Sequence, residues 1–418
     1  MTLHTLDADP ACPPAVEAPP SRPTTAVGLA SPSRPRRRLV VRGSSVASIA
    51  PETWGALAAR SPYATPFSRW AFHRAWWDGY GASAHEDTIL IQDPALPAGS
   101  APVAIVPLMH RHEVEPDEAD RRSTIRHGNE GPLTPVEPTA KAVFFGASYH
   151  ADYATILAAP ADLPAVAAAL VDHLGSPSAV GDDHPMPWDV VDLRRLRCGD
   201  PASDALTDAF RAAATTCGWT VVREREDVCP VVTLPEGVDF EGFLDTLDKK
   251  ARHEIRRKIR RAEAAGVTAL TESTDPVSLL PTFIGFHQAK WGERGLFPPN
   301  AGGDASRVFV RRLFEAFGPT GPVRLTFLTC GERRIAGAIH FDDGVTLSYY
   351  NAGLDPEARD LSPGVILIAQ YVKAAIATGR RRLDFLRGDE SYKYEWGAVD
   401  EPIERILVTR SVAGQAPR

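Results

Sequence analysis

The sequence has no long apolar run and no paired cysteine motif. Since about 18 consecutive apolar residues are needed to cross a bilayer, no transmembrane helix is expected. The net charge of −7 excludes a general nucleic-acid coat protein, because such proteins need basic residues in excess to neutralise phosphates. None of the cysteines forms a CxxC pair and their number is odd, which argues against a disulfide framework and fits the reducing cytoplasm. They are Cys12, Cys198, Cys217, Cys229 and Cys330.

Motifs that mark several enzyme classes are missing as well. The sequence contains no Walker motif, no GxGxxG fingerprint and no GxSxG nucleophile elbow. His110 and His112 alternate on a predicted strand and therefore share one face, but no third ligand has a recognisable spacing. We therefore expect no metal.

The length and composition of the chain are those of a globular protein with two domains. Hydrophobic residues make up 44% of the 418 residues, which is enough for a sizeable core. Residues 1–38 are rich in Pro, Ala, Ser and Thr and predict a disordered tail. Within it, Arg36 to Arg38 precede a short apolar stretch that Arg42 breaks, so no signal peptide is expected. Two α/β segments follow, at 39–235 and 236–412.

Two predicted helices stand out by their faces. Residues 67–80 carry an aromatic face, which we expect to form the core of the first domain. Residues 240–265 predict one long helix that ends at Gly266. Its apolar stripe runs from Phe240 to Ile259, and its opposite face is heavily basic. A run of charge of this kind is usually a solvated face.

The most informative stretch is 345–388. A strand there leads to a helix whose start, Ser362-Pro363-Gly364, suits an N-cap, a first helical position and a close approach of ligand to backbone. A parallel strand follows at 382–386 and completes a βαβ unit. Free N–H groups and a partial positive charge at a helix start are what a pyrophosphate needs. Many βαβ units bind nothing at this position, and Ser-Pro-Gly often serves only as a cap.

Several segments resemble one branch of the GNAT acyltransferase superfamily. They are FLDTLDKKARHEIRRKIRRAEAAG (243–266), FHQAKW (286–291), LSPGVILIAQYVKAAIATG (361–379) and LDFLRGDESYKYEWG (383–397). The branch is that of the CelD/BcsL-like proteins, which carry a cellulose-biosynthesis label and are related to the FemAB-type transferases. The resemblance covers about residues 240–400 and implies tandem GNAT-like folds, the first of them degenerate. It also implies direct transfer of an acyl group from acyl-CoA to an amine.

Site residues follow partly from this resemblance and partly from position. The acyl-CoA site is expected at Leu361, Ser362, Pro363, Gly364 and Val365. Catalytic candidates are Asp384, Asp389, Tyr392 and His340, and substrate-binding candidates are Arg252, His287, Trp291, Tyr350 and Lys393. Carboxylates at the carboxyl end of a parallel strand can orient or deprotonate an amine. Each candidate has an alternative: the two aspartates in salt bridges, His340 in the core, and His287 with Trp291 in ordinary packing.

Three functions therefore stay open. The first is an acyl-CoA-dependent N-acyltransferase acting on a small-molecule, glycan or peptide amine. The second is a FemAB-like transfer of an aminoacyl group from tRNA, for which the basic face of 240–265 would bind the acceptor stem instead of the phosphates of CoA. The third is a non-catalytic accessory protein of polysaccharide or envelope synthesis.

Overall fold

The computed structural model describes residues 37–113, 133–176, 184–268 and 270–410, and their chain order repeats itself. The first series is β1 (Val40–Gly43), α1 (Pro51–Arg60), α2 (Trp70–Tyr80), β2 (His85–Glu86), β3 (Ile89–Gln92), β4 (Ala104–Val106), β5 (Leu108–Arg111), β6 (Ala142–Phe145), β7 (Leu157–Ala158), α4 (Leu163–Gly175), β8 (Val190–Arg197), α5 (Pro201–Cys217) and β9 (Trp219–Thr233). The second series, preceded by α6 (Phe240–Asp245) and α7 (Lys249–Ala264), is β10 (Thr271–Glu272), α8 (Pro276–Trp291), α9 (Ala301–Phe317), β11 (Val323–Cys330), β12 (Arg333–Asp342), β13 (Thr346–Leu354), α10 (Pro363–Ala377), β14 (Arg382–Asp384), α11 (Ser391–Tyr394) and β15 (Val399–Arg410).

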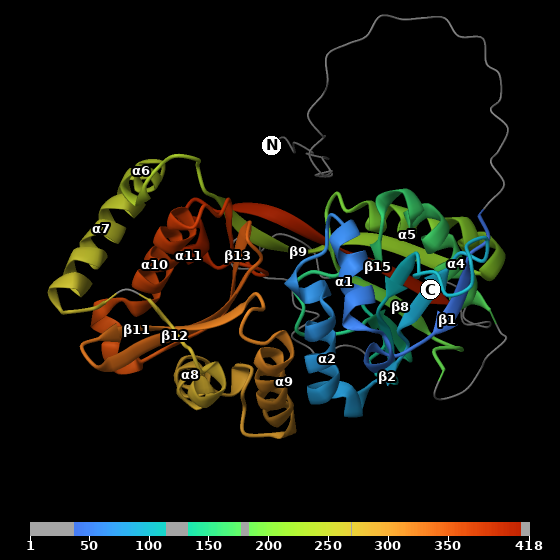
Figure 1. Ribbon diagram of the computed structural model, residues 1–418, viewed down its shortest axis with the longest axis horizontal. Coiled ribbons are helices and arrows are strands. Elements are labelled where there is room, and N and C mark those ends of the chain that lie inside the picture. The colour runs from blue at the N-terminus through green and yellow to red at the C-terminus, as the bar shows by residue number, and fades with distance from the viewer. Residues whose placement is uncertain (1–36, 114–132, 177–183, 269, 411–418) are drawn as a thin grey trace, which may run out of the picture.

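Each series contains the same parallel β–α–β unit. In the first, β6 pairs parallel with β8 and α4 connects them; in the second, β13 pairs parallel with β14 across α10. Antiparallel strands precede both units, as the hairpin turns at 331–333 and 342–344 predict for the second. The expected mixed α/β class is confirmed. The two series form two lobes (Figure 1), with α7, α10 and β12 in one and α4, α5 and β2 in the other.

The lobes exchange their last strands. The eleven-stranded sheet has the order β10-β11-β12-β13-β14-β9-β15-β8-β6-β5-β2, so β9 of the first series lies beside β14 and β15 of the second lies beside β8. Strands β9 and β15 also pair with each other along most of their length. A second sheet, β1-β3-β4-β7, belongs to the first series alone.

A buried ionic cluster holds the exchanged strand β15. Arg405 is 1% exposed and donates to both carboxylate oxygens of Asp192 on β8, at 2.7 and 2.8 Å, and to Glu224 on β9 at 3.0 Å. Burial alone would raise the pKa of Asp192, but Arg194 and Arg405 hold it below its usual value. Loss of one partner would leave an uncompensated buried charge, so the cluster fixes which strands pair.

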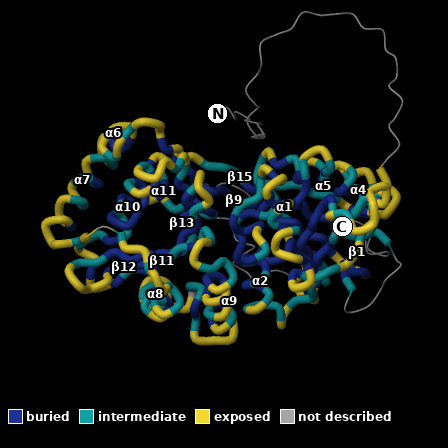
Figure 2. The backbone as a smooth tube through the Cα atoms, viewed as in Figure 1, coloured by how far each residue is buried: buried dark blue, intermediate teal, exposed yellow. Residues whose placement is uncertain are grey.

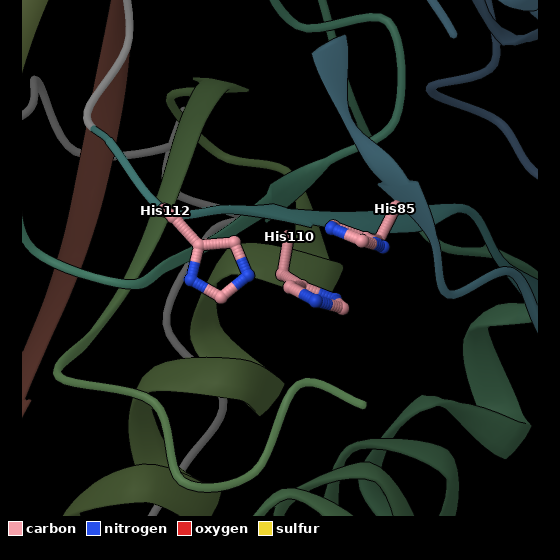
Figure 3. Close-up of side chains that lie close together, drawn as sticks. All are labelled: His85, His110 and His112. Atoms are coloured by element: carbon pink, nitrogen blue, oxygen red, sulfur yellow. The ribbon is translucent and has the colours of Figure 1, made fainter. Parts of the chain in front are cut away.

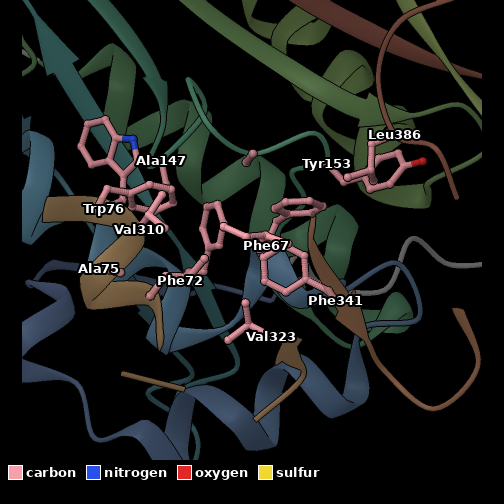
Figure 4. Close-up of a cluster of buried hydrophobic side chains, with 14 of the residues drawn as sticks. Phe67, Phe72, Ala75, Trp76, Ala147, Tyr153, Val310, Val323, Phe341 and Leu386 are labelled. Carbon is pink, nitrogen blue, oxygen red and sulfur yellow. The ribbon is translucent and has the colours of Figure 1, made fainter. Parts of the chain in front are cut away.

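The largest apolar cluster lies between the lobes (Figure 4). Phe67 meets Phe341 at a ring-centroid distance of 5.3 Å, and Phe72 on α2 meets Phe309 on α9 at 5.5 Å. The aromatic face of α2 predicted packing within the first lobe alone. In the structure, α2 also packs against α9 of the other lobe. Buried segments run through the strands of both lobes, while α6 and α7 are exposed on their outer sides (Figure 2).

The predicted single helix at 240–265 is two helices. It breaks at 246–248 because Asp248 caps a new helix start: its Oδ1 accepts from Lys250 N at 2.8 Å and from Ala251 N at 3.4 Å. The apolar stripe continues across the break, with Phe243 and Ile255 both buried, which explains why the pattern resembled one helix. Among the described helices, none combines the length and apolar character needed to cross a membrane.

Candidate active site

A short ordered segment connects the end of β13 to the start of α10. The 3-10 helix Pro356–Leu361 connects them, and Ser362 turns the chain with φ 53° and ψ 51°, in the left-handed region. Ser362 occupies the N-cap position and Pro363 the first helical position, as the sequence predicts. The serine side chain makes no capping bond, however; its Oγ accepts from Arg261 Nη2 at 2.7 Å. A basic residue of α7 is thus tied to the helix start.

A groove of about 570 Å³ opens at this helix start. Its lining includes Ser362, Pro363, Gly364 and Val365, while Leu361 lies next to it without lining it. The other lining residues are Lys258, Ala289, Lys290, Leu354, Asp355, Pro356 and Arg359. Asp355, the one acid among them, is paired with Arg333. Three basic side chains and a helix N-terminus therefore face this space, which suits an anion. One of them, Lys258, also pairs with Glu254 at 3.5 Å, and Arg333 is shared between Asp355 and Glu357.

The basic face of α7 divides into two parts. Arg256 pairs with Glu241 at 2.8 Å and with Asp245 at 2.9 Å, and Arg257 pairs with Glu254 at 2.7 Å. Arg252 likewise meets Asp245 at 3.3 Å and does not line the groove. Only the part nearer the end of the helix, with Lys258 and Arg261, reaches the groove and the start of α10.

Strands β13 and β14 part at Asp384. Their parallel pairing covers three residue pairs and ends at Ser348 with Asp384. The next residue, Phe385, donates its N–H to Pro230 O on the β9 side at 3.0 Å, whereas β13 continues along β12 as far as Leu354. The two strands consequently diverge directly beyond the candidate carboxylate.

Asp384 is 3% exposed, and both of its oxygens accept hydrogen bonds. Oδ1 accepts from Leu386 N at 2.8 Å and Oδ2 accepts from Tyr153 OH at 2.8 Å. Burial raises the pKa of Asp384 to about 6, and the two hydrogen bonds and Arg197 oppose that rise. Tyr153 comes from the other lobe, and the Arg197 guanidinium lies 4.9 Å from its ring centroid. Sequence reasoning missed Tyr153 because it stands 231 residues from Asp384, and no local pattern signals the contact.

The loop beyond Asp384 is held from inside by Lys393. Its Nζ donates to three carbonyl oxygens, those of Leu386 at 3.1 Å, Arg387 at 2.9 Å and Gly388 at 2.8 Å. It also pairs with Glu390 at 2.9 Å. Leu386 has a φ of 58°, a left-handed conformation that costs energy for a branched residue. The buried ammonium stabilises this conformation. Lys393 therefore has a structural role in the loop that requires no contact with a substrate.

Two other candidates of this loop differ in exposure. Asp389 is fully buried, at 0%. Tyr392 on α11 is 37% exposed, and its ring lies 6.0 Å from that of Phe385. Phe385 in turn lies 6.2 Å from Tyr349 on β13, next to the point where the strands part. Of the two, Tyr392 is the one that a ligand can reach.

The side chains of His340 and Tyr350 form hydrogen bonds within the protein. His340 shares a 2.9 Å hydrogen bond from Nδ1 with Tyr371 OH, and Tyr371 also contacts Thr326. Burial lowers the pKa of His340 to about 3, so the ring is neutral at physiological pH. Tyr350 donates its OH to His150 O at 3.1 Å, across the boundary between the lobes.

His287 and Trp291 share one face of α8, as their spacing predicts, with ring centroids 6.3 Å apart. His287 is 2% exposed, and burial followed by the charge of Lys290 lowers its pKa to about 4. Trp291 is 40% exposed, and Lys290 Nζ lies 4.5 Å from its ring centroid. Because Lys290 lines the groove at α10, Trp291 lies beside that groove, whereas His287 packs against Phe283 and Phe297 and does not line it.

Comparisons with known proteins show which families and folds this chain resembles. Residues 249–394 match the acetyltransferase (GNAT) domain family. The matched residues make up about a third of the chain and include α7, the groove and Asp384, so this segment is similar to a GNAT acetyltransferase domain. No curated protein matches the sequence.

Solved structures match over most of the chain. The crystal structure of FemX has a TM-score of 0.52 at 10% identity, with 85% of this chain and 96% of that chain covered. A conserved protein of unknown function from Bacteroides thetaiotaomicron has a TM-score of 0.49 at 10% identity, covering 89% and 100%. A tandem GNAT protein from the clavulanic acid biosynthesis pathway has a TM-score of 0.45 at 10% identity, covering 91% and 100%. Together with the repeated element order, the match to FemX identifies the fold as tandem GNAT-like.

Proposed function

We propose that this protein is an N-acyltransferase that moves an acyl group from an acyl-CoA thioester to an amine. The observation that carries the proposal is the groove at the start of α10, inside the residues that match the GNAT domain. Its cations, Lys258, Lys290 and Arg359, would meet the phosphates of CoA together with the amides of the helix start. The acyl-thioester end would then extend toward the point where β13 and β14 part.

The reaction needs no covalent enzyme intermediate. The neutral amine attacks the thioester carbonyl, a C–N bond forms, the C–S bond breaks, and the thiolate leaves. The amine must first lose a proton, because a free ammonium has a pKa of about 10. A carboxylate whose pKa is raised to about 6 is a better proton acceptor at neutral pH than an ordinary aspartate. We assign this role to Asp384, oriented by Tyr153, and the donation of a proton to the leaving sulfur to Tyr392. The second proton, which the nitrogen loses as the amide forms, replaces the one that Tyr392 has donated.

Binding of the donor can be tested at Gly364. A β-carbon added there would meet only Leu354 Cδ1, at 3.4 Å, which is an ordinary contact. The fold therefore has room for a side chain, but a carboxylate would lie where we place the phosphates. Calorimetry with acetyl-CoA and with a longer acyl-CoA should show binding that Gly364→Glu abolishes.

Gly285→Glu is the matched control. Gly285 lies on α8 in the same lobe, and a β-carbon there would have no neighbour within 4 Å. This variant should bind acyl-CoA like the parent protein. If no CoA thioester binds the parent, or if both glutamates weaken binding equally, the proposal is wrong.

The first half is proposed to help form the acceptor site. A groove of about 720 Å³ between α2 and α9 is lined by both lobes, among others by Tyr80, Tyr149 and Asn300. It is large enough for a sugar or a peptide end. The finer assignments also stay proposals: the CelD/BcsL-like branch, the division at 39–235 and 236–412, and a cytoplasmic location.

The second candidate is aminoacyl transfer from charged tRNA. It is favoured by the exposed basic side chains of α7 that have no role in the groove. Ion pairs to Glu241, Asp245 and Glu254 weaken it, because they already neutralise much of this charge. It requires steeply salt-dependent tRNA binding that charge reversal at Arg256 and Arg260 reduces. A filter-binding titration at two salt concentrations distinguishes it from the first candidate.

A further inference from the structure

Three histidines come together in the lobe opposite to α10. His85 on β2 is the direct cross-strand partner of His110 on β5, and His112 follows His110 by two residues (Figure 3). Residues two apart on an extended chain point to one face, so all three imidazoles gather on the same side. One nitrogen from each ring lies within 4.8 Å of the other two.

The central ring of the three is fixed by a carboxylate. His110 is fully buried, and its Nδ1 lies 2.6 Å from Asp87 Oδ2. A carboxylate at Nδ1 accepts the N–H of that nitrogen and fixes the orientation of the ring. This is the arrangement that orients histidine ligands in metal sites and makes them more basic.

The other two rings are less buried than that of His110. His85 is half-buried and His112 is exposed. The rings of His85 and His110 are stacked at 4.5 Å with an interplanar angle of 6°, and His112 stands at 74° to His110. Ligand nitrogens around a tetrahedral zinc ion, each about 2.1 Å from it, lie about 3.4 Å apart. Closing the cluster thus takes shifts of up to about 1.4 Å between the ligand nitrogens. The His85 ring must also turn out of its stack with His110, because a bound ion lies in the plane of each ligand ring.

We propose that His85, His110 and His112 bind one first-row transition-metal ion, with Zn²⁺ as the expected species. Neutral imidazoles favour zinc, copper and nickel over magnesium and calcium, which prefer oxygen ligands. Three histidines with an open fourth position are an established zinc arrangement. Asp87 acts as the positioning residue for His110.

The site has a structural consequence that is separate from acyl transfer. Strand β2 is the last strand of the eleven-stranded sheet and has only two residues. An ion held by His85, by His110 on β5 and by His112 just after β5 would cross-link this short edge strand to its neighbour. The cluster and α10 belong to different lobes (Figure 1), so metal binding does not depend on the function proposed above.

Binding is tested on tag-free full-length protein treated with a chelator and dialysed. Calorimetry with Zn²⁺ should show one ion per chain with a micromolar or tighter Kd, and Co²⁺ should give visible absorption bands of a tetrahedral site. Mg²⁺ should show no heat of binding. Absence of Zn²⁺ binding at about 100 μM, a level that a three-histidine site would saturate, overturns the proposal.

Variants separate this cluster from adventitious sites. His112→Gln changes an exposed residue, so the fold is preserved, and it should weaken Zn²⁺ binding at least tenfold. Asp87→Asn should weaken it about 10- to 100-fold, as expected for a positioning carboxylate. His253→Gln, at an exposed histidine of α7, is the control and should leave the Kd unchanged. Equal affinity of His112→Gln and the parent protein would show that the ion binds elsewhere.

Discussion

Replacing Asp384 by Asn should make the protein more stable at alkaline pH, although it removes a candidate catalytic group. Burial raises the pKa of this carboxyl from 3.8 to about 6. Between these two values the folded chain keeps a proton that the unfolded chain has lost. The stability of the parent protein therefore falls as the pH rises through this window. The loss at pH 8 is about 3 kcal/mol, since each unit of pKa shift corresponds to about 1.4 kcal/mol.

Asparagine is uncharged and escapes this cost, but its amide cannot accept both hydrogen bonds as the carboxylate does. Losing one bond costs about 1 kcal/mol. The variant should thus exceed the parent by about 1–2 kcal/mol at pH 8, and the advantage should shrink by about 2 kcal/mol at pH 4. Chemical denaturation followed by tryptophan fluorescence at both pH values measures the difference, in which the other titrating groups cancel.

Asp208→Asn serves as the matched control, because Asp208 is exposed on α5. It should change stability by less than about 0.5 kcal/mol at either pH. A pH-independent difference between Asp384→Asn and the parent would refute the raised pKa and, with it, the proposed role of Asp384 as proton acceptor. Acyl transfer by Asp384→Asn should in any case be slower, by about 10²- to 10⁴-fold for a lost general base.

Two further substitutions test the loop and the groove. Lys393→Met should destabilise the protein by about 3 kcal/mol, because three carbonyl oxygens lose their buried donor. Lys250→Met, on the exposed face of α7, is the control and should have little effect. Thermal denaturation of both variants measures the difference in stability. Lys258→Glu should weaken acetyl-CoA binding about tenfold and make that binding less dependent on salt. Lys249→Glu, outside the groove, is the control and should change neither property. Calorimetry at low and high salt measures both variants, and equal behaviour of the two would contradict the prediction.

Local patterns predicted the second series well. The two hairpin turns at 331–333 and 342–344, the helix that begins at Pro363 and the parallel strand after it are found as expected. Each of these depends on residues within one short window: alternation for a strand, glycine and aspartate for a turn, proline for a helix start. A groove opens at this helix start and Lys258, from the basic face, lines it, while its use as an acyl-CoA site stays a prediction.

Structural features that depend on residues far apart in the sequence could not be predicted from local patterns. The apolar stripe across 246–248 hid the helix break, because its spacing stays helical while Asp248 opens a new cap. The contact between Tyr153 and Asp384 and the pairing of His85 with His110 depend on tertiary structure. For this reason the third histidine was missed, and His340 could not be placed in its closed network with Tyr371. The assigned catalytic and binding roles stay predictions.

The exchange of β9 and β15 affects how the protein can be made. Arg405 and Asp192 are 213 residues apart in sequence, yet they meet in the buried cluster between β15 and β8. A ribosome therefore releases the whole first lobe long before the strand that completes its sheet exists. Until then β8 presents an open edge, which is a surface for pairing with the wrong chain. The two lobes share one element order, but each needs a strand of the other to complete its sheet. We therefore expect either half expressed alone to aggregate rather than to fold.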